Sequence, residues 1–217
     1  MSAPVQPKKR AAGPVIVTPR PAYWLGRTLL VGYLGVYHRF RAQGVEHLPR
    51  SGGVLIVANH QSYLDIPALA VATPRHVAFV ARATLAESRF LDWLMREAGC
   101  VLIRPGTPDR AALEQMIAHL EQGDCVSIFP EGTRTNDGQM GVFRAGAVVA
   151  ARRAGAPIVP ACIRGAFEAW PRSRKLPRPR RLSVHFGAPI ASGEEDALER
   201  ARGVIAGMIG DAPAAAR

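Results

Sequence analysis

The chain has 217 residues, of which 48% are hydrophobic and 21% charged, and its 28 Lys and Arg against 17 Asp and Glu give a formal net charge of +11. This length and composition describe one globular domain with a sizeable core, and they exclude a disordered chain, collagen and a coiled coil. Its three widely spaced cysteines exclude a disulfide framework and a zinc finger, and favour reduced, buried thiols. The positive charge requires an anionic partner: nucleic acid, a membrane surface or a phosphorylated substrate.

The excess charge lies in two proline-rich segments. Residues 1–50 contain eight Lys and Arg against one acidic residue, and residues 171–182 contain six against none. Because proline favours exposed, extended backbone, we expect both segments at the surface. Signatures of RNA-binding and zinc-finger modules are absent, so we interpret the two segments as contacts with an anionic membrane and not with nucleic acid.

The chain begins with a predicted disordered basic tail at 1–21, followed by a helix within 22–43. Residues 23–37 are apolar and include Trp24 and three tyrosines, with basic residues before and after them. The longest uncharged stretch is about half of the roughly 20 residues that cross a bilayer, so we expect a helix in the membrane interface. A helix packed on its own domain is an equal alternative. One folded domain is expected at 44–210 and a tail at 211–217.

After residue 50, short segments rich in Val and Ile alternate with helical ones. Strands are expected at 54–58, 77–80, 100–104, 125–129, 158–163 and 182–186. Helices are expected at 63–72, 90–98, 111–122, 145–154 and 194–209. This alternation predicts an α/β domain with a mostly parallel central sheet covered by helices on both faces.

A histidine follows the first of these strands. In VLIVANHQSYLD, residues 54–65, His60 comes at the carboxyl end of the strand, where open α/β sheets bind their ligands. Ser62 and Asp65 have the spacing of a capping box, so the helix should start near Tyr63, and Asp65 would serve only its first turn. Alternatively, Asp65 holds one imidazole nitrogen of His60 protonated and leaves the other as a general base. No G-x-S-x-G motif supplies a nucleophile, so the base would activate a substrate hydroxyl or a water.

A second strand runs into polar residues at 125–134, CVSIFPEGTR. Pro130 would end the strand, and Gly132 would permit close approach to the backbone. Arg134 offers a planar fork that suits a phosphate. The alternative for this segment is a simple turn with a surface ion pair between Glu131 and Arg134.

Together, H-x-x-x-x-D at 60–65 and FPEGTR at 129–134 resemble the glycerolipid acyltransferase family typified by 1-acylglycerol-3-phosphate acyltransferase. The resemblance covers about residues 44–190, since four further stretches follow the family pattern in order: GCVLIR at 99–104, FRAGA at 143–147, IVPACI at 158–163 and FGAP at 186–189. The chain departs from that pattern at 82–92, where it keeps the cation of a K-x-E-L block, as Arg82, but lacks its acid and the following P-x-x-G. This region shapes the substrate entrance in the family.

The resemblance implies transfer of a fatty acyl group from acyl-CoA or acyl-carrier protein to a lysophospholipid. The expected acceptor is 1-acylglycerol 3-phosphate, which gives phosphatidic acid, at the cytoplasmic face of the membrane. Catalysis would fall to His60 and Asp65, without an acyl-enzyme, a cofactor or a metal. A backbone N–H near Gly132 would stabilise the oxyanion. The expected substrate-binding residues are Arg104, Phe129, Pro130, Glu131, Gly132, Thr133, Arg134 and Arg144. For Glu131 two roles stay open: binding the polar part of the acceptor, or orienting Arg134.

Several alternatives remain open. Another transferase would use glycerol 3-phosphate or a lyso-aminolipid as acceptor. A thioesterase-like hydrolase would release thiol without a lysolipid, and a basic membrane-binding protein would release none. A metal hydrolase built on His60 would need further clustered ligands, which the spacing of the other histidines does not provide.

Overall fold

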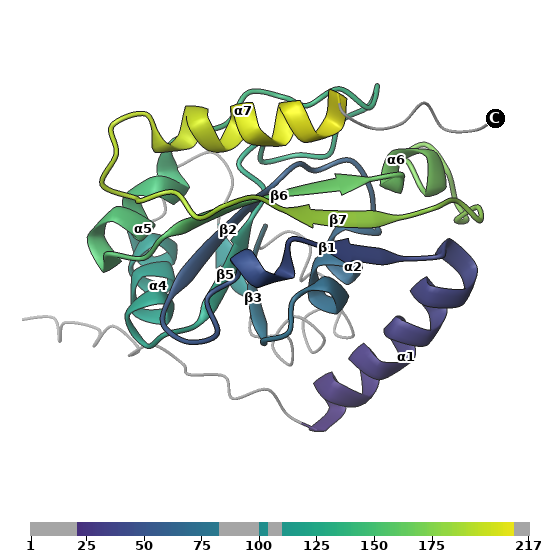
Figure 1. Ribbon diagram of the computed structural model, residues 1–217, viewed down its shortest axis with the longest axis horizontal. Coiled ribbons are helices and arrows are strands. Elements are labelled where there is room, and N and C mark those ends of the chain that lie inside the picture. Colours follow the sequence, from purple (N-terminus) through teal and green to yellow (C-terminus); the bar gives the residue numbers. More distant parts are fainter. Residues whose placement is uncertain (1–20, 83–99, 104–109, 211–217) are drawn as a thin grey trace, which may run out of the picture.

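The computed structural model describes residues 21–82, 100–103 and 110–210 (Figure 1). The expected tails at 1–20 and 211–217, the expected helix at 90–98 and the candidate residue Arg104 lie outside the described residues.

The centre of the fold is a seven-stranded sheet in the order β1-β7-β6-β2-β5-β3-β4. Its strands are β1 (Arg41–Gln43), β2 (Val54–Ala58), β3 (Val77–Arg82), β4 (Val101–Ile103), β5 (Cys125–Ile128), β6 (Ile158–Arg164) and β7 (Ser183–Phe186). The five strands from β2 to β6 are parallel to one another, and β7 pairs with β6 in the antiparallel sense. The expected mostly parallel sheet is therefore confirmed.

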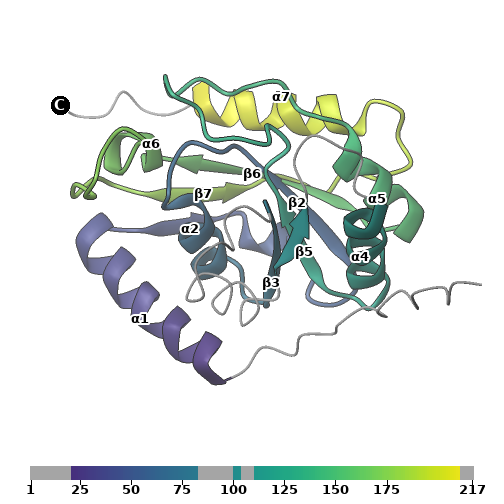
Figure 2. The ribbon, with the colours of Figure 1, turned by 180° about the vertical axis from the view of Figure 1, so that it is seen from behind.

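Helices cover both faces of this sheet (Figures 1 and 2). One face carries α1 (Pro21–His38), α2 (Asp65–Ala72) and the short α6 (Ala166–Ala169), and the other carries α4 (Arg110–Glu121), α5 (Gly146–Ala154) and α7 (Ala197–Gly210). The central strand β2 is buried throughout, and its side chains alternate between the two layers: Val54 and Ile56 belong to the first core, Leu55 and Val57 to the second.

The N-terminal helix covers the apolar stretch 23–37 and ends at His38, within the expected segment 22–43. Arg39 has a φ of +47°, and the N–H of Phe40 donates to the carbonyl of Leu34, 3.1 Å away, so the chain turns there. The residues that follow form β1, which pairs in parallel with β7 at the edge of the sheet. This strand was not expected, because its three residues are exposed and carry no apolar strand pattern.

One side of α1 packs on the domain and the other faces solvent. The Arg27 guanidinium donates three hydrogen bonds of 3.0 Å to the last carbonyls of α2 and to Thr73 beyond it, and Leu34 is fully buried. The opposite side exposes apolar residues, among them Leu25, Leu29 and Val36. Within the described residues, no helix combines the length and apolarity that crossing a bilayer requires.

Candidate active site

The two motifs meet because their strands are neighbours. β2 and β5 pair in parallel, so His60, which follows β2, and Phe129, which follows β5, leave the sheet at the same edge. Their rings stack with centroids 4.1 Å apart and an interplanar angle of 16°. This is the edge at which α/β sheets place their ligands.

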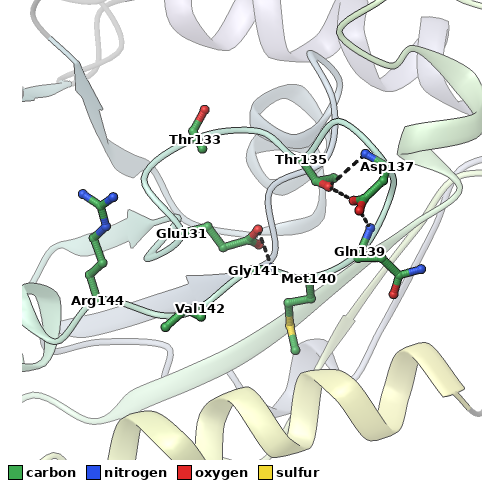
Figure 3. A pocket seen from close by; sticks show the side chains of 9 residues that line it. All are labelled: Glu131, Thr133, Thr135, Asp137, Gln139, Met140, Gly141, Val142 and Arg144. Carbon is green, nitrogen blue, oxygen red and sulfur yellow. Dashed lines mark hydrogen bonds between the residues drawn. The ribbon is translucent and has the colours of Figure 1, made fainter.

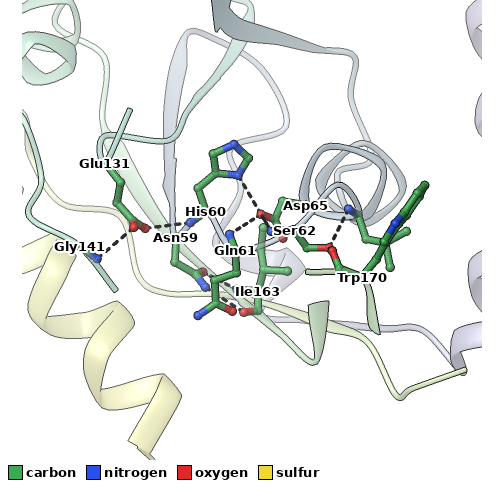
Figure 4. A network of polar contacts seen from close by, with 10 residues as sticks. Asn59, His60, Gln61, Ser62, Asp65, Glu131, Gly141, Ile163 and Trp170 are labelled. Carbon is green, nitrogen blue, oxygen red and sulfur yellow. Dashed lines mark hydrogen bonds and ion pairs between the residues drawn. The ribbon is translucent and has the colours of Figure 1, made fainter. Parts of the chain in front are cut away.

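His60 and Asp65 form a hydrogen-bonded pair beside Phe129. Nδ1 of His60 lies 2.8 Å from Oδ2 of Asp65, which is fully buried, whereas the imidazole is 17% exposed (Figure 4). A carboxylate only accepts hydrogen bonds, so Nδ1 carries the proton and Nε2 keeps its lone pair. The orienting role expected for Asp65 therefore has the required geometry, and Nε2 is the nitrogen that can take a proton.

The same oxygen of Asp65 also organises the turn before α2. Oδ2 accepts hydrogen bonds from the backbone N–H groups of Gln61, at 2.6 Å, and Ser62, at 2.7 Å. Both roles considered for Asp65, orienting an imidazole and serving the helix start, thus fall on one atom. The helix begins at Asp65, two residues later than expected, because residues 61–64 form a turn that this carboxylate holds.

Glu131 holds the backbone of His60 (Figure 4). Its Oε1 accepts from the N–H of His60 at 2.8 Å, and its Oε2 accepts from the N–H of Gly141 at 3.0 Å. The N–H of Thr135 donates to the carbonyl of His60, also at 3.0 Å. The loop after β5 therefore fixes the peptide groups on both sides of His60.

The structure decides against one alternative for this loop, the ion pair, and limits the choice of oxyanion donor. Within the described range 110–210, Glu131 forms no ion pair with Arg134, because both of its carboxylate oxygens already accept hydrogen bonds from backbone N–H groups. The N–H of Gly132 itself donates to the carbonyl of Phe129 at 3.0 Å and closes a turn, so an oxyanion donor near Gly132 stays a prediction for the neighbouring amides. Burial raises the pKa of Glu131 above its usual value, and the two N–H donors only partly oppose this.

Arg134 lies on an aromatic ring. Its guanidinium carbon is 3.7 Å from the centroid of the Tyr63 ring, and its buried Nη1 has no hydrogen-bond partner among the described residues. Tyr63, 45% exposed, lies 5.1 Å from the Trp170 ring, centroid to centroid. A guanidinium without a carboxylate partner is suited to an anionic ligand.

A cavity of about 400 Å³ opens beside the FPEGTR segment (Figure 3). Three expected site residues, Glu131, Thr133 and Arg144, line it together with the loop through Gln139. Its walls combine apolar side chains, Met140 and Val142, with polar ones, and two carboxylates, of Glu131 and Asp137, line it together with the Arg144 guanidinium. Pro130 is buried next to this cavity and fixes the loop, because its carbonyl accepts from the N–H of Arg144 at 3.0 Å.

The sequence did not single out Asn59, Tyr63 or Trp170 as site residues. The Asn59 side chain exchanges two hydrogen bonds with the backbone of Ile163 in β6, of 2.7 and 3.0 Å, and so ties the end of β2 to its neighbour (Figure 4). A polar residue ending an otherwise apolar strand was the available signal for Asn59. For the two aromatic residues no sequence pattern indicated a contact with Arg134.

A second His–Asp pair lies elsewhere. Nδ1 of His119 is 2.8 Å from Oδ2 of Asp124, but Asp124 directly precedes β5, at the amino end of the strand. This pair is therefore at the opposite edge of the sheet from His60. The cysteines are poor nucleophiles, because burial raises the pKa of Cys100 and Cys125 to about 11.

The chain matches the family described as Acyltransferase over residues 39–164. It is 30% identical over 175 residues to the chloroplastic 1-acyl-sn-glycerol-3-phosphate acyltransferase BAT2 of Brassica napus, which covers 78% of this chain and 51% of that protein. It is 35% identical over 111 residues to the lyso-ornithine lipid O-acyltransferase of Pseudomonas aeruginosa, covering 51% of this chain and 42% of that protein.

The 1-acyl-sn-glycerophosphate acyltransferase PlsC from Thermotoga maritima has the same fold in its crystal structure. The TM-score is 0.69 at 24% identity, over 86% of this chain and 81% of that one. The chain spans about half the length of the curated plant relatives it matches. The family match extends over more than half of the residues and includes both the His60–Asp65 pair and the FPEGTR segment, so the chain belongs to the acyltransferase family.

Proposed function

We propose that this protein transfers a fatty acyl group from an acyl thioester to the free hydroxyl of 1-acylglycerol 3-phosphate, giving phosphatidic acid. The observation that carries the proposal is the His60–Asp65 pair, with Nε2 as its free base, on the same sheet edge as Arg134. The names of the plant relatives and of several others support this acceptor. The donor is acyl-CoA or acyl-carrier protein.

In the proposed reaction Nε2 of His60 removes the proton from the acceptor hydroxyl as that oxygen attacks the thioester carbonyl. A C–O bond forms, the C–S bond breaks, and the imidazolium returns the proton to the departing thiolate. Asp65 stabilises the imidazolium through the 2.8 Å hydrogen bond to Nδ1. The products are an ester and a free thiol, so no residue is acylated and no metal or cofactor takes part.

The acceptor phosphate would be bound by arginines at the same edge. Arg134 has an unpaired donor there, and Arg144 lines the neighbouring cavity. Arg104 is the third candidate from the sequence. Holding the phosphate positions the hydroxyl for attack, and such positioning contributes a large part of the rate in transfer reactions.

An acceptor screen tests this proposal. Purified protein is incubated with one acyl-CoA and, in turn, 1-acylglycerol 3-phosphate, glycerol 3-phosphate and a lyso-ornithine lipid, and products are identified by mass. The expected result is phosphatidic acid and one free thiol per ester. The lyso-ornithine lipid represents a second candidate function, which the Pseudomonas relative favours; its acylation without that of the phosphorylated lipids would replace the proposal. Thiol release into water alone would indicate a hydrolase.

We also propose that the protein works as a peripheral protein on an anionic membrane, at its cytoplasmic face, and binds no nucleic acid. The last turn of α1 contacts the basic segment 171–182: the Tyr37 hydroxyl donates to the carbonyl of Pro177 at 3.4 Å, and Nδ1 of His38 lies 3.1 Å from the carbonyl of Arg180. The same helix exposes apolar residues, among them Leu25, Leu29 and Val36. A helix with an exposed apolar side, close to exposed basic residues, suits the surface of a membrane that contains acidic lipids.

Vesicle co-sedimentation tests the membrane contact. Neutralising the basic segment should weaken binding to anionic vesicles at least tenfold, because each juxtamembrane base contributes about 1 kcal/mol at low ionic strength. Replacing the exposed Arg153 of α5, on the opposite face of the sheet, is the control and should change nothing. Unchanged binding after the first replacement would contradict the proposal. The residues to change to Gln are Arg172, Arg174, Lys175, Arg178, Arg180 and Arg181.

A further inference from the structure

The Tyr63 ring lies between the catalytic turn and the candidate phosphate-binding arginine. Tyr63 belongs to the H-x-x-x-x-D motif itself, between Ser62 and Asp65, whose hydrogen bond fixes this turn at 2.7 Å. Its ring face meets the Arg134 guanidinium at 3.7 Å. A side chain of the first motif thus contacts the last residue of the second.

Trp170 supports the other side of this arrangement. Its ring is 5.1 Å from that of Tyr63, with an interplanar angle of 42°. The Trp170 indole N–H donates to the carbonyl of Arg174 at 3.0 Å, and its own carbonyl accepts from the Ser62 hydroxyl at 2.7 Å. Both ends of Trp170 are therefore fixed, and the position of the Tyr63 ring follows from its backbone and from this neighbour.

Within the described structure, no acidic side chain orients Arg134. The two nearest acids along the chain have other partners: Glu131 accepts from two backbone N–H groups, and Asp137 accepts from the Thr135 hydroxyl and from the N–H of Gln139. A guanidinium held over the face of a ring is restricted in its rotamers, and its N–H groups form a planar fork that can bind a phosphate. Without the ring, the long arginine side chain would sample many rotamers, and ordering it would weaken phosphate binding.

We propose that Tyr63 is a positioning residue that holds Arg134 for the phosphate of the acceptor and thereby favours phosphorylated over unphosphorylated acceptors. This inference rests on the proposed function for its acceptor. Tyr63 takes no part in proton transfer, so its loss should raise the acceptor KM far more than it lowers kcat. From the strength of exposed cation–π contacts, the affinity for a phosphorylated acceptor should fall roughly 3- to 30-fold when the ring is removed.

The test compares Tyr63→Leu, Tyr63→Phe and Arg134→Gln by calorimetric titration with a short-chain 1-acylglycerol 3-phosphate, and by acyl transfer. The affinity should fall in Tyr63→Leu and be close to wild type in Tyr63→Phe, because phenylalanine keeps the ring. In the transfer assay the acceptor KM should rise while kcat and the donor KM stay within about twofold. In the double variant, the acceptor affinity should be little lower than in Arg134→Gln alone, because the two substitutions remove the same contact.

Equal affinity in Tyr63→Leu and wild type would overturn the proposal, as would equal losses for 1-acylglycerol 3-phosphate and for 1-acylglycerol, which has no phosphate. Melting curves check folding, and Tyr63→Gln provides a second variant without a ring if the leucine variant does not fold. Binding without any acyl transfer would refute the proposed function while the titrations still test Tyr63. A wild-type protein that binds no phosphorylated lipid would overturn both.

Discussion

Replacing Asp65 with asparagine removes the charge of the buried carboxylate and keeps its shape. Oδ2 accepts three N–H groups, from His60 Nδ1, Gln61 and Ser62, at 2.8, 2.6 and 2.7 Å. The asparagine carbonyl can take this place, which puts the NH₂ group where Oδ1 is buried without a hydrogen-bond partner. An unpaired buried donor costs about 1–3 kcal/mol of unfolding free energy. For a chain of this size, each kcal/mol lowers the melting temperature by about 2–4 °C.

The effect on catalysis should be much larger. The asparagine carbonyl still accepts from Nδ1, so His60 keeps its tautomer, and what is lost is the negative charge that stabilises the imidazolium. General-base catalysis contributes about 10²–10⁴-fold, and we expect kcat to fall within this range while the acceptor KM changes less than about threefold. The assay is thiol release in the presence of 1-acylglycerol 3-phosphate, with thermal unfolding measured on the same samples.

The second His–Asp pair offers a matched control. Asp124→Asn alters a hydrogen bond of the same type and length, 2.8 Å to His119, at the other edge of the sheet. This variant should keep the wild-type kcat. If Asp65→Asn retains kcat within about threefold of wild type, or if both variants lose activity alike, the assignment of Asp65 as the carboxylate that stabilises the His60 imidazolium is refuted.

Three further predictions concern the residues that hold the site and the fold. Burial raises the pKa of Glu131, so the native state binds the proton of this carboxyl group more tightly than the unfolded chain does. The stability that this proton binding contributes is complete below the usual carboxyl pKa and is lost as the pH rises through the raised pKa. Denaturant titrations should show this decline in wild type and not in Glu131→Gln. Arg27→Ala removes three hydrogen bonds to carbonyls at the end of α2 and should lower the unfolding free energy by about 1.5–3 kcal/mol in chemical denaturation. Asn59→Ala leaves the N–H and C=O of Ile163 without their side-chain partners, which should cost about 1–3 kcal/mol in thermal unfolding and reduce kcat by displacing His60.

Each of these has an outcome that contradicts it. A pH dependence that is identical in wild type and Glu131→Gln would show that this carboxyl is not the group concerned. Arg153→Ala, at an exposed site of α5, is the control for Arg27→Ala, and equal stabilities of the two variants would mean that the contact with α2 contributes nothing. An Asn59→Ala variant with unchanged stability would show that the hydrogen bonds of Asn59 to Ile163 do not stabilise the contact between β2 and β6.

Much of the fold follows from patterns of apolar residues. The described strands and helices that were expected end within three residues of their predicted bounds, because buried strands and amphipathic helices carry strong signals. β1 was missed because its three residues are exposed and form a strand only by pairing with β7, far away in the chain. The four-residue α6 is too short for a helical period to be visible. The antiparallel pairing of β7 with β6 likewise depends on tertiary packing.

Most residues of the candidate site could be predicted from the sequence, but several of the contacts between them could not. The family resemblance placed His60 and the segment after β5 in one site, and they meet because parallel strands bring their carboxyl ends together. The partners of Glu131 are backbone N–H groups, which leave no trace in the side-chain sequence. The contact of Tyr63 with Arg134 depends on the path of the loop and on rotamers. Neither could be derived from spacing.

The central claim is that His60 is the base of a direct acyl transfer to a lysolipid hydroxyl. The most direct measurement is the rate at which wild type and His60→Ala form phosphatidic acid from an acyl thioester and 1-acylglycerol 3-phosphate, followed by mass together with the free thiol. We predict one thiol per phosphatidic acid in wild type, and a rate at least 100-fold lower in a His60→Ala protein that is still folded. Transfer by His60→Ala at a rate near that of wild type would contradict the account.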